Sequence, residues 1–225
     1  MGLLDRWRRG SSAPDTTEAP PRRAGTRRRR RRPAAAGIAG EAALRETLRE
    51  DPNDERAFAT LAETVRTRAA EGHDATAPTS DEARRAADNA VWALAEELAQ
   101  SPRAWRPLLE LGRLSLTDDR EGALRRLGIA AERDPSGHAL AEALAILREA
   151  GMPNDALGLG VGHWRPREHD VEAGRHLVAA AIDSGRLGEA RRHLRALAEH
   201  PDQGRVAPLR AELEEAITRA DRARH

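Results

Sequence analysis

The chain has 225 residues, of which 39% are hydrophobic, and these are almost wholly Ala, Leu, Val and Ile, with one Phe, four Trp and no Tyr. Small and medium aliphatic side chains suit closely packed helices better than strands, so we expect an all-α fold. The absence of cysteine excludes disulfides, thiolate metal sites and a cysteine nucleophile. No segment approaches the ~18 consecutive apolar residues of a membrane-spanning helix.

The net charge of +1 is unevenly distributed along the chain. Residues 1–33 carry 11 arginines against three acidic residues, a net charge of +8, whereas the remaining residues carry 27 arginines against 34 acidic residues, a net charge of −7. A basic arm therefore precedes an acidic body, and the two parts call for separate explanations.

Residues 1–36 are predicted to form a disordered basic arm, because several prolines interrupt any helix and the charge has one sign. The arm contains six consecutive arginines that we predict to bind polyanions: Arg27, Arg28, Arg29, Arg30, Arg31 and Arg32. Three interpretations stay open. The arm binds nucleic acid through its phosphates, it binds an anionic membrane with Leu3, Leu4 and Trp7 in the interface, or it is a solubilising linker.

Residues 37–225 show the apolar spacing of amphipathic helices, with about ten helices expected between 34 and 224. The first of these is a lone helix over 34–50, and the last is a terminal capping helix over 204–224. The polar stretch 70–82 is predicted to be a loop inserted between two helices.

Four helices end in similar motifs, LREDP, LAQSP, AERDP and LAEHP, which place prolines at Pro52, Pro102, Pro135 and Pro201. From Pro102 to Pro135 is 33 residues, and from Pro135 to Pro201 is 66, or two periods. From Pro52 to Pro102 is 50, one period plus 17, and this excess coincides with the predicted loop. A period near 33–34 with two helices in each unit indicates an α-solenoid of antiparallel helix pairs.

These units resemble tetratricopeptide repeats (TPR). The matching residues are Ala123, Leu127 and Ala130 in one unit, Gly151 and Ala156 in the next, and Gly185, Ala190, Leu194 and Pro201 in the third. The resemblance implies close helix approach at the small residues, a glycine with positive φ after the first helix, and a proline that opens the next helix. It covers most of 34–201, but Gly160 stands where a bulky residue is expected and Pro166 comes slightly early.

In tetratricopeptide proteins the first helices of each pair line a concave groove that holds a peptide. The resemblance therefore implies that Arg106, Arg113, Arg148 and Arg175 face such a groove, where they would bind a carboxylate or an acidic segment of a partner. The alternative is that these arginines belong to ordinary solvated faces balanced by Glu and Asp.

Two further motifs share some features of ligand sites. The stretch GLGVGHW (158–164) lacks the spacing and the preceding strand of a dinucleotide loop, so Gly158 and Gly162 are expected either to allow close helix packing or to weaken the helix. His163, His169 and His176, with Asp170 nearby, are spaced too widely for a zinc site and are expected to be solvent-facing or helix-capping. We expect no metal and no cofactor.

No catalytic motif is present: the chain has no G-x-S-x-G, no H-E-x-x-H and no P-loop. Trp92, Trp105 and Trp164 are expected to pack between helices. We therefore expect a non-enzymatic scaffold that binds a protein or peptide partner, with the arm serving localisation, or alternatively a protein whose main activity is binding membrane or nucleic acid through residues 1–33. The residues after Met1 lack the apolar stretch of a secretory signal, so a cytoplasmic protein is expected, on the inner face of the membrane under the membrane interpretation.

Overall fold

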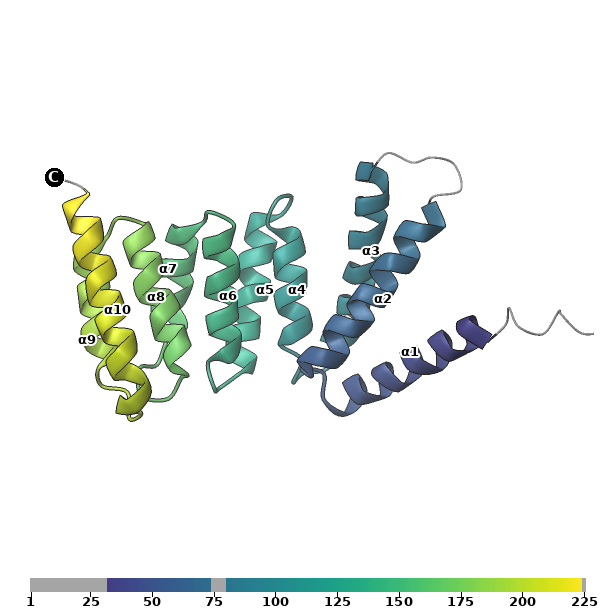
Figure 1. Cartoon of the computed structure of the whole chain (residues 1–225), viewed down its shortest axis with the longest axis horizontal. Coiled ribbons are helices and arrows are strands. Elements are labelled where there is room, and N and C mark those ends of the chain that lie inside the picture. The colour runs from purple at the N-terminus through teal and green to yellow at the C-terminus, as the bar shows by residue number, and fades with distance from the viewer. Residues whose placement is uncertain (1–31, 74–79, 224–225) are drawn as a thin grey trace, which may run out of the picture. The chain divides into compact units, whose positions relative to one another are not determined.

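The computed structural model describes residues 32–73 and 80–223, which form ten helices and contain no strand, as the all-α prediction requires (Figure 1). The helices are α1 (Arg32–Glu50), α2 (Glu55–His73), α3 (Ser80–Ala99), α4 (Arg106–Ser115), α5 (Arg120–Arg133), α6 (His138–Glu149), α7 (Pro153–His163), α8 (Val171–Asp183), α9 (Leu187–Leu197) and α10 (Gln203–Arg222). The chain divides into two units, residues 1–37 and 38–225. The described part of the first unit is the start of α1, and the packing below concerns the second unit.

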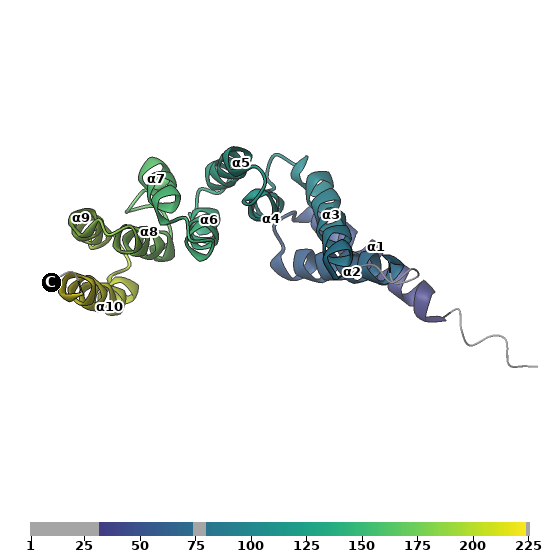
Figure 2. The same ribbon diagram turned by 90° about the horizontal axis from the view of Figure 1, so that it is seen from above.

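The helices from α4 to α10 are arranged in two rows (Figure 2). Each packs on its neighbour in the chain. In addition α4, α6, α8 and α10 contact one another in sequence along one row, and α5 contacts α7 in the other row, which α9 continues. Most packing is therefore between segments close together in the chain.

One hydrophobic cluster runs through the second unit from Leu48 to Ile217. It is built mainly from Leu, Ala and Val, and among the described residues Phe58, which is 7% exposed, is the one phenylalanine in it. The alanines Ala123, Ala156 and Ala190 are completely buried, as are many of the leucines. Small side chains at these places let neighbouring helix backbones approach closely.

Three aspartates fix where helices begin. The side chains of Asp119, Asp170 and Asp202 accept hydrogen bonds from backbone N–H groups in the first turns of α5, α8 and α10, respectively. These bonds satisfy N–H groups that have no partner within the helix. Pro107 and Pro153 occupy the first turns of α4 and α7, where no N–H is required.

Gly151 and Gly185 end α6 and α8 in the left-handed conformation, with φ of 72° and 71°. At the first, the Gly151 N–H donates to the Arg148 carbonyl (3.0 Å) and the Met152 N–H to the Leu147 carbonyl (2.8 Å). At the second, the N–H groups of Gly185 and Arg186 make the same two bonds, to the carbonyls of Ile182 and Ala181. Both are Schellman motifs, and the glycine C-caps expected from the sequence are confirmed.

The predicted loop 70–82 is too long. α2 continues to His73 and α3 begins at Ser80, so only residues 74–79 between them fall outside the described residues. Ala69, Ala70 and Glu71 favour helix, and Asp81 and Glu82 in the first turn of α3 stabilise its N-terminus, which explains the longer helices.

The boundary of the basic arm also differs from the expectation. α1 begins at Arg32 with Pro33 in its first turn, so residues 32–36, assigned to the arm, are helical. The disorder predicted for residues 1–31 lies outside the described residues.

α10 agrees with the helix expected over 204–224. It buries Val206, Leu209, Leu213 and Ile217 and exposes polar and charged side chains on its other side. Within the described chain, no helix combines the length and the apolar character needed to cross a bilayer.

Candidate functional site

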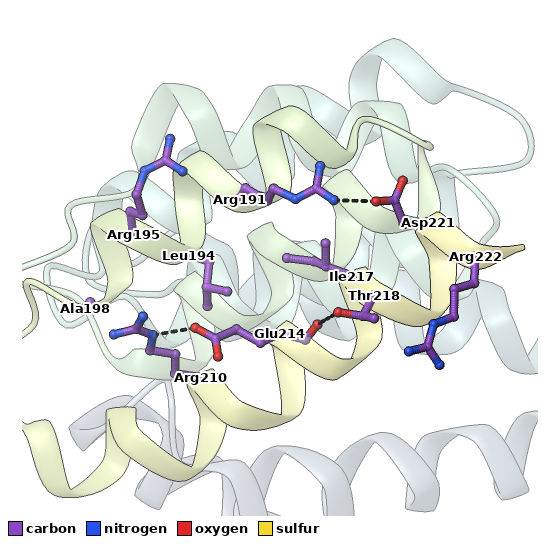
Figure 3. Close-up of a pocket in the computed structure, with 10 residues that line it drawn as sticks. All are labelled: Arg191, Leu194, Arg195, Ala198, Arg210, Glu214, Ile217, Thr218, Asp221 and Arg222. Atoms are coloured by element: carbon purple, nitrogen blue, oxygen red, sulfur yellow. Dashed lines mark hydrogen bonds and ion pairs between the residues drawn. The ribbon is translucent and has the colours of Figure 1, made fainter. Parts of the chain in front are cut away.

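A cavity of about 720 Å³ lies between α9 and α10 (Figure 3). It is lined by Arg191, Leu194 and Arg195 of α9 with the following Ala198, and from α10 by Arg210, Glu214, Ile217, Thr218, Asp221 and Arg222. The first four residues follow the spacing i, i+3, i+4, i+7, and those of α10 follow a similar spacing, so each wall is one face of a helix. Leu194 and Ile217 form an apolar floor between two charged borders.

The charges at the rim of the cavity are unbalanced. Arg191 pairs with Asp221 across the two helices (2.7 Å), and Arg210 pairs with Glu214 within α10 (2.8 Å). Arg195 and Arg222 are exposed and have no carboxylate partner among residues 32–73 and 80–223. The two guanidinium groups leave the cavity with an excess of positive charge.

The arginines predicted to line a partner groove lie on α4, α6 and α8, and each is already bound to a carboxylate. Arg106 makes a bidentate pair with Glu142 (2.9 and 3.2 Å), also donates to the Asn53 carbonyl, and its side chain is only 15% exposed. Arg113 pairs with Glu110 of the same helix, and the hydrogen bonds that it donates to this carboxylate raise the pKa of Arg113.

The other two predicted arginines are paired in the same way. Arg148 donates to Asp183 (2.8 Å) and contacts the ring of His176. Arg175 donates to Glu172 (3.2 Å) and lies 3.5 Å from Glu212. The four arginines share no bonding partner, so the structure does not bring them together as one clamp around a common carboxylate.

Ion pairs between residues 35 apart in the chain are a feature that the sequence did not lead us to expect. Arg120 donates to Asp155 (2.6 Å), and Arg205 makes a bidentate pair with Asp170 (2.8 and 3.0 Å); each pair is separated by 35 residues, as is the pair of Arg148 with Asp183. The hydrogen bonds from Arg205 are the main cause of the lowered pKa of Asp170. An arginine with an acid about one period away was the signal available in the sequence.

The histidines weighed as metal ligands have other surroundings. His169 is buried against Gly137, and this burial lowers its pKa, whereas His163 donates from Nδ1 to the Leu159 carbonyl of its own helix and faces Glu132. His176 also has a lowered pKa, through burial and then through the charge of Arg148. Across residues 32–73 and 80–223, no three His, Asp or Glu side chains are grouped so that they would hold a metal ion.

The structure brings together a serine, a histidine and two aspartates at the start of α6. The Ser136 Oγ lies 2.7 Å from His138 Nδ1 and 2.6 Å from Asp134 Oδ1, and His138 Nε2 lies 3.8 Å from Asp170. The hydroxyl has a charged acceptor in Asp134, which also accepts from the Ala139 N–H, and the His138 side chain is 63% exposed. This geometry is that of a helix N-terminal cap.

In the stretch 158–164, close packing occurs at a different glycine from those predicted. A Cβ at Gly160 would lie 2.6 Å from Leu177, whereas Gly158 and Gly162 have open space around them, so the close-packing alternative for these two is wrong.

Trp164 packs edge-on against His193, Arg126 lies over the ring of Trp92, and Arg106 lies over the ring of Trp105. All three tryptophans contact the core, as expected.

The arginines predicted to bind polyanions cannot be placed in a site. Arg32 is the first residue of α1, and Arg27 to Arg31 lie outside the described residues.

Comparisons with family models, with curated proteins and with solved structures find no match to this chain.

Proposed function

We propose that the chain is a non-enzymatic scaffold of TPR-like helix pairs that binds a protein or peptide partner, with residues 1–33 setting where it acts. The observation that carries this proposal is the recurrence of one helix end. Gly151 and Gly185 stand 34 residues apart, have the same φ within a degree, and close the same pair of hydrogen bonds. A repeated helix–turn–helix unit is the simplest source of such a match.

The ion pairs between helices support the same architecture. Arg120 with Asp155, Arg148 with Asp183, and Asp170 with Arg205 each join residues 35 apart. Contacts at one constant sequence separation are expected where every unit packs on the next in the same way.

Partner binding is the function that such an arrangement serves most readily, because paired rows of helices present an extended surface. Arg113 and Arg175 are the predicted groove arginines whose side chains stay most exposed, at 45% and 40%. Glu110 and Glu172, which pair with them, lie on the same helices, and Arg175 also reaches Glu212 of α10, so an incoming acidic group would exchange with these carboxylates. Arg106 is held more tightly and serves the packing of α4 on α6.

Cross-linking mass spectrometry in the native cell tests this proposal with three full-length forms of the chain. These are the wild type, a variant with Arg27 to Arg32 replaced by Gln, and the double variant Arg113→Glu, Arg175→Glu. We expect one partner to cross-link to the body of the wild type and of the Gln variant, and to be lost from the double variant. A partner lost only from the Gln variant would contradict the proposal.

The uneven charge favours a second candidate function, in which binding to a polyanion through residues 1–33 is the main activity. A net charge of +8 in 33 residues predicts binding that weakens steeply with salt. Flotation with anionic liposomes and mobility shift of duplex DNA, each over a salt series, separate the two ligands. Binding that survives both high salt and the Gln variant would rule this function out.

A further inference from the structure

The cavity between α9 and α10 occupies a place that is filled elsewhere in the molecule. The residues that line it from α9 are Arg191, Leu194 and Arg195, with the following Ala198. Two periods earlier, 67 residues before each of these, stand Leu124, Leu127, Gly128 and Ala131 of α5. This register also aligns the buried Ala123 with the buried Ala190.

The face of α5 that corresponds to the cavity wall of α9 is covered by α7. A Cβ at Gly128 would lie 3.8 Å from Leu159 and 3.9 Å from His163, both of α7. The His163 ring also reaches Glu132 of α5, at 3.6 Å. The corresponding face of α9 borders the open cavity, and Arg195 stands where Gly128 receives α7.

The reason lies in α10. α6 and α8 end after 12 and 13 residues at a left-handed glycine, and a second helix folds back from that turn. α10 runs for 20 residues, and its one glycine, Gly204, lies in its first turn. No second helix folds back onto α10 within the described residues, and its second half instead forms the other wall of the cavity.

We propose that this cavity is a docking groove for an acidic amphipathic helix of a partner protein, which would lie on α9 in the place that α7 occupies on α5. Both walls are helix faces, and the α10 wall extends from Arg210 to Arg222, about 18 Å or three turns. Leu194 and Ile217 form the apolar floor and are 5% and 4% exposed, so the leucines of such a helix would contact their outer atoms. Arg195 and Arg222 are available for its carboxylates.

Charge complementarity selects this occupant. The lining holds four arginines against Glu214 and Asp221, and both acids are already paired. A basic segment, including this chain's own residues 1–33, would be repelled, whereas acidic side chains gain two unpaired guanidinium groups. The inference rests on the repeat architecture and partner binding of the proposed function.

Binding of synthetic peptides to the full-length chain tests the groove directly. The probe is a capped, fluorescently labelled helix of about four turns with leucines at i, i+3, i+4 and i+7 and glutamates on both flanks. The controls are a scrambled peptide and one with lysine in place of glutamate. We expect the acidic helix to bind, the lysine peptide not to bind, and the affinity to fall as salt rises.

Matched charge reversals locate the site. Arg195→Glu with Arg222→Glu should lower the affinity for the acidic helix by roughly tenfold or more. Arg192→Glu with Arg219→Glu, on the same two helices but outside the cavity, should leave it unchanged. Circular dichroism checks that both double variants keep their helices. Equal loss in the two variants, or equal binding of acidic and scrambled peptides, would overturn the proposal.

Two further outcomes identify where an error lies. If sedimentation shows a dimer of the wild type that Arg195→Glu with Arg222→Glu dissociates, a second copy covers the groove and the partner-helix proposal is wrong. If the cellular partner found by cross-linking stays bound to Arg195→Glu with Arg222→Glu, the proposed docking groove is wrong and the proposed function stands. If the acidic helix binds but no cellular partner is found, the groove stands and the proposed function falls.

Discussion

The matching faces of α5 and α9 differ in one respect: the first is covered by α7 and the second borders a cavity. Both helices bury an alanine and a leucine, which are Ala123 and Leu127 in α5 and Ala190 and Leu194 in α9. What changes is the residue where the covering helix would lie, which is Gly128 in α5 and Arg195 in α9. A glycine therefore stands where a neighbouring helix packs closely on α5, and an arginine stands at the matching position of α9, which borders a cavity.

The largest expected effect is the loss of a leucine from the interior. Leu127→Ala should lower the free energy of unfolding by about 3 kcal/mol or more, because Leu127 is fully buried and closely packed against Gly112. Leu194→Ala should cost less, about 2 kcal/mol, because its site borders the α9–α10 cavity and loses fewer contacts. Chemical denaturation measures both, and equal losses would remove the distinction between interior and end.

Gly160 and Gly158 provide a second test of close packing. Gly160→Ala should destabilise by about 2 kcal/mol, since the new methyl group would collide with Leu177 in a packed interface. Gly158→Ala, on the same helix with open space around it, should stabilise by up to about 1 kcal/mol through helix propensity. Thermal unfolding of the two variants should move in opposite directions, and a shared direction would contradict the packing described here.

The turns that let second helices fold back should show a smaller effect. Gly151→Ala and Gly185→Ala each place a Cβ in the left-handed region and should cost about 1 kcal/mol apiece. Gly204→Ala in the first turn of α10 is the control and should not be destabilising to that extent, because Gly204 does not have a positive φ. Similar losses at all three glycines would argue against a repeated turn.

The smallest expected effect concerns pH and the attachment of α10. Arg205 of α10 lowers the pKa of Asp170, so this pair contributes stability above the ordinary pKa of an aspartate and loses it as the pH falls through the lowered folded-state value. Asp170→Asn should therefore reduce stability at neutral pH and flatten its decline at acid pH. Denaturation at pH 7 and at about pH 3 measures this. Asp118→Asn, between α4 and α5, is the surface control, and an unchanged acid limb in Asp170→Asn would refute the role of the pair.

Much of the fold could be predicted because its rules are local. The apolar spacing predicted about ten helices, and the glycines at 151 and 185 predicted C-caps. The expectation that the repeated prolines open the next helix was wrong, because Pro52, Pro102, Pro135 and Pro201 lie in turns two to four residues before it. The predicted loop 70–82 was too long. Gly72, Pro78 and the polar residues around them indicate a loop, but the helix propensity of Ala69, Ala70 and Glu71 extends α2 to His73.

The arginine pairs and the α9–α10 cavity were harder to predict, because they depend on contacts between different helices. Spacing placed Arg106 and Arg148 on first helices, but their carboxylate partners Glu142 and Asp183 lie 36 and 35 residues away. The α9–α10 cavity depends on a turn that α10 lacks, and a missing glycine is a weaker signal than a present one. Close packing at Gly160 instead of Gly158 likewise depends on the position of Leu177 in the next helix.

The two-row arrangement has a consequence for how the molecule opens. The main contacts of α10 are with α8 and α9 alone, whereas α6 contacts helices on both sides of it in its row and in the neighbouring row. Helices at an end of such an array open and close without disturbing the middle. Backbone amides of α10 should thus exchange with deuterium faster than those of α6 and α8, and a helix seated on α9 and α10 should slow them first.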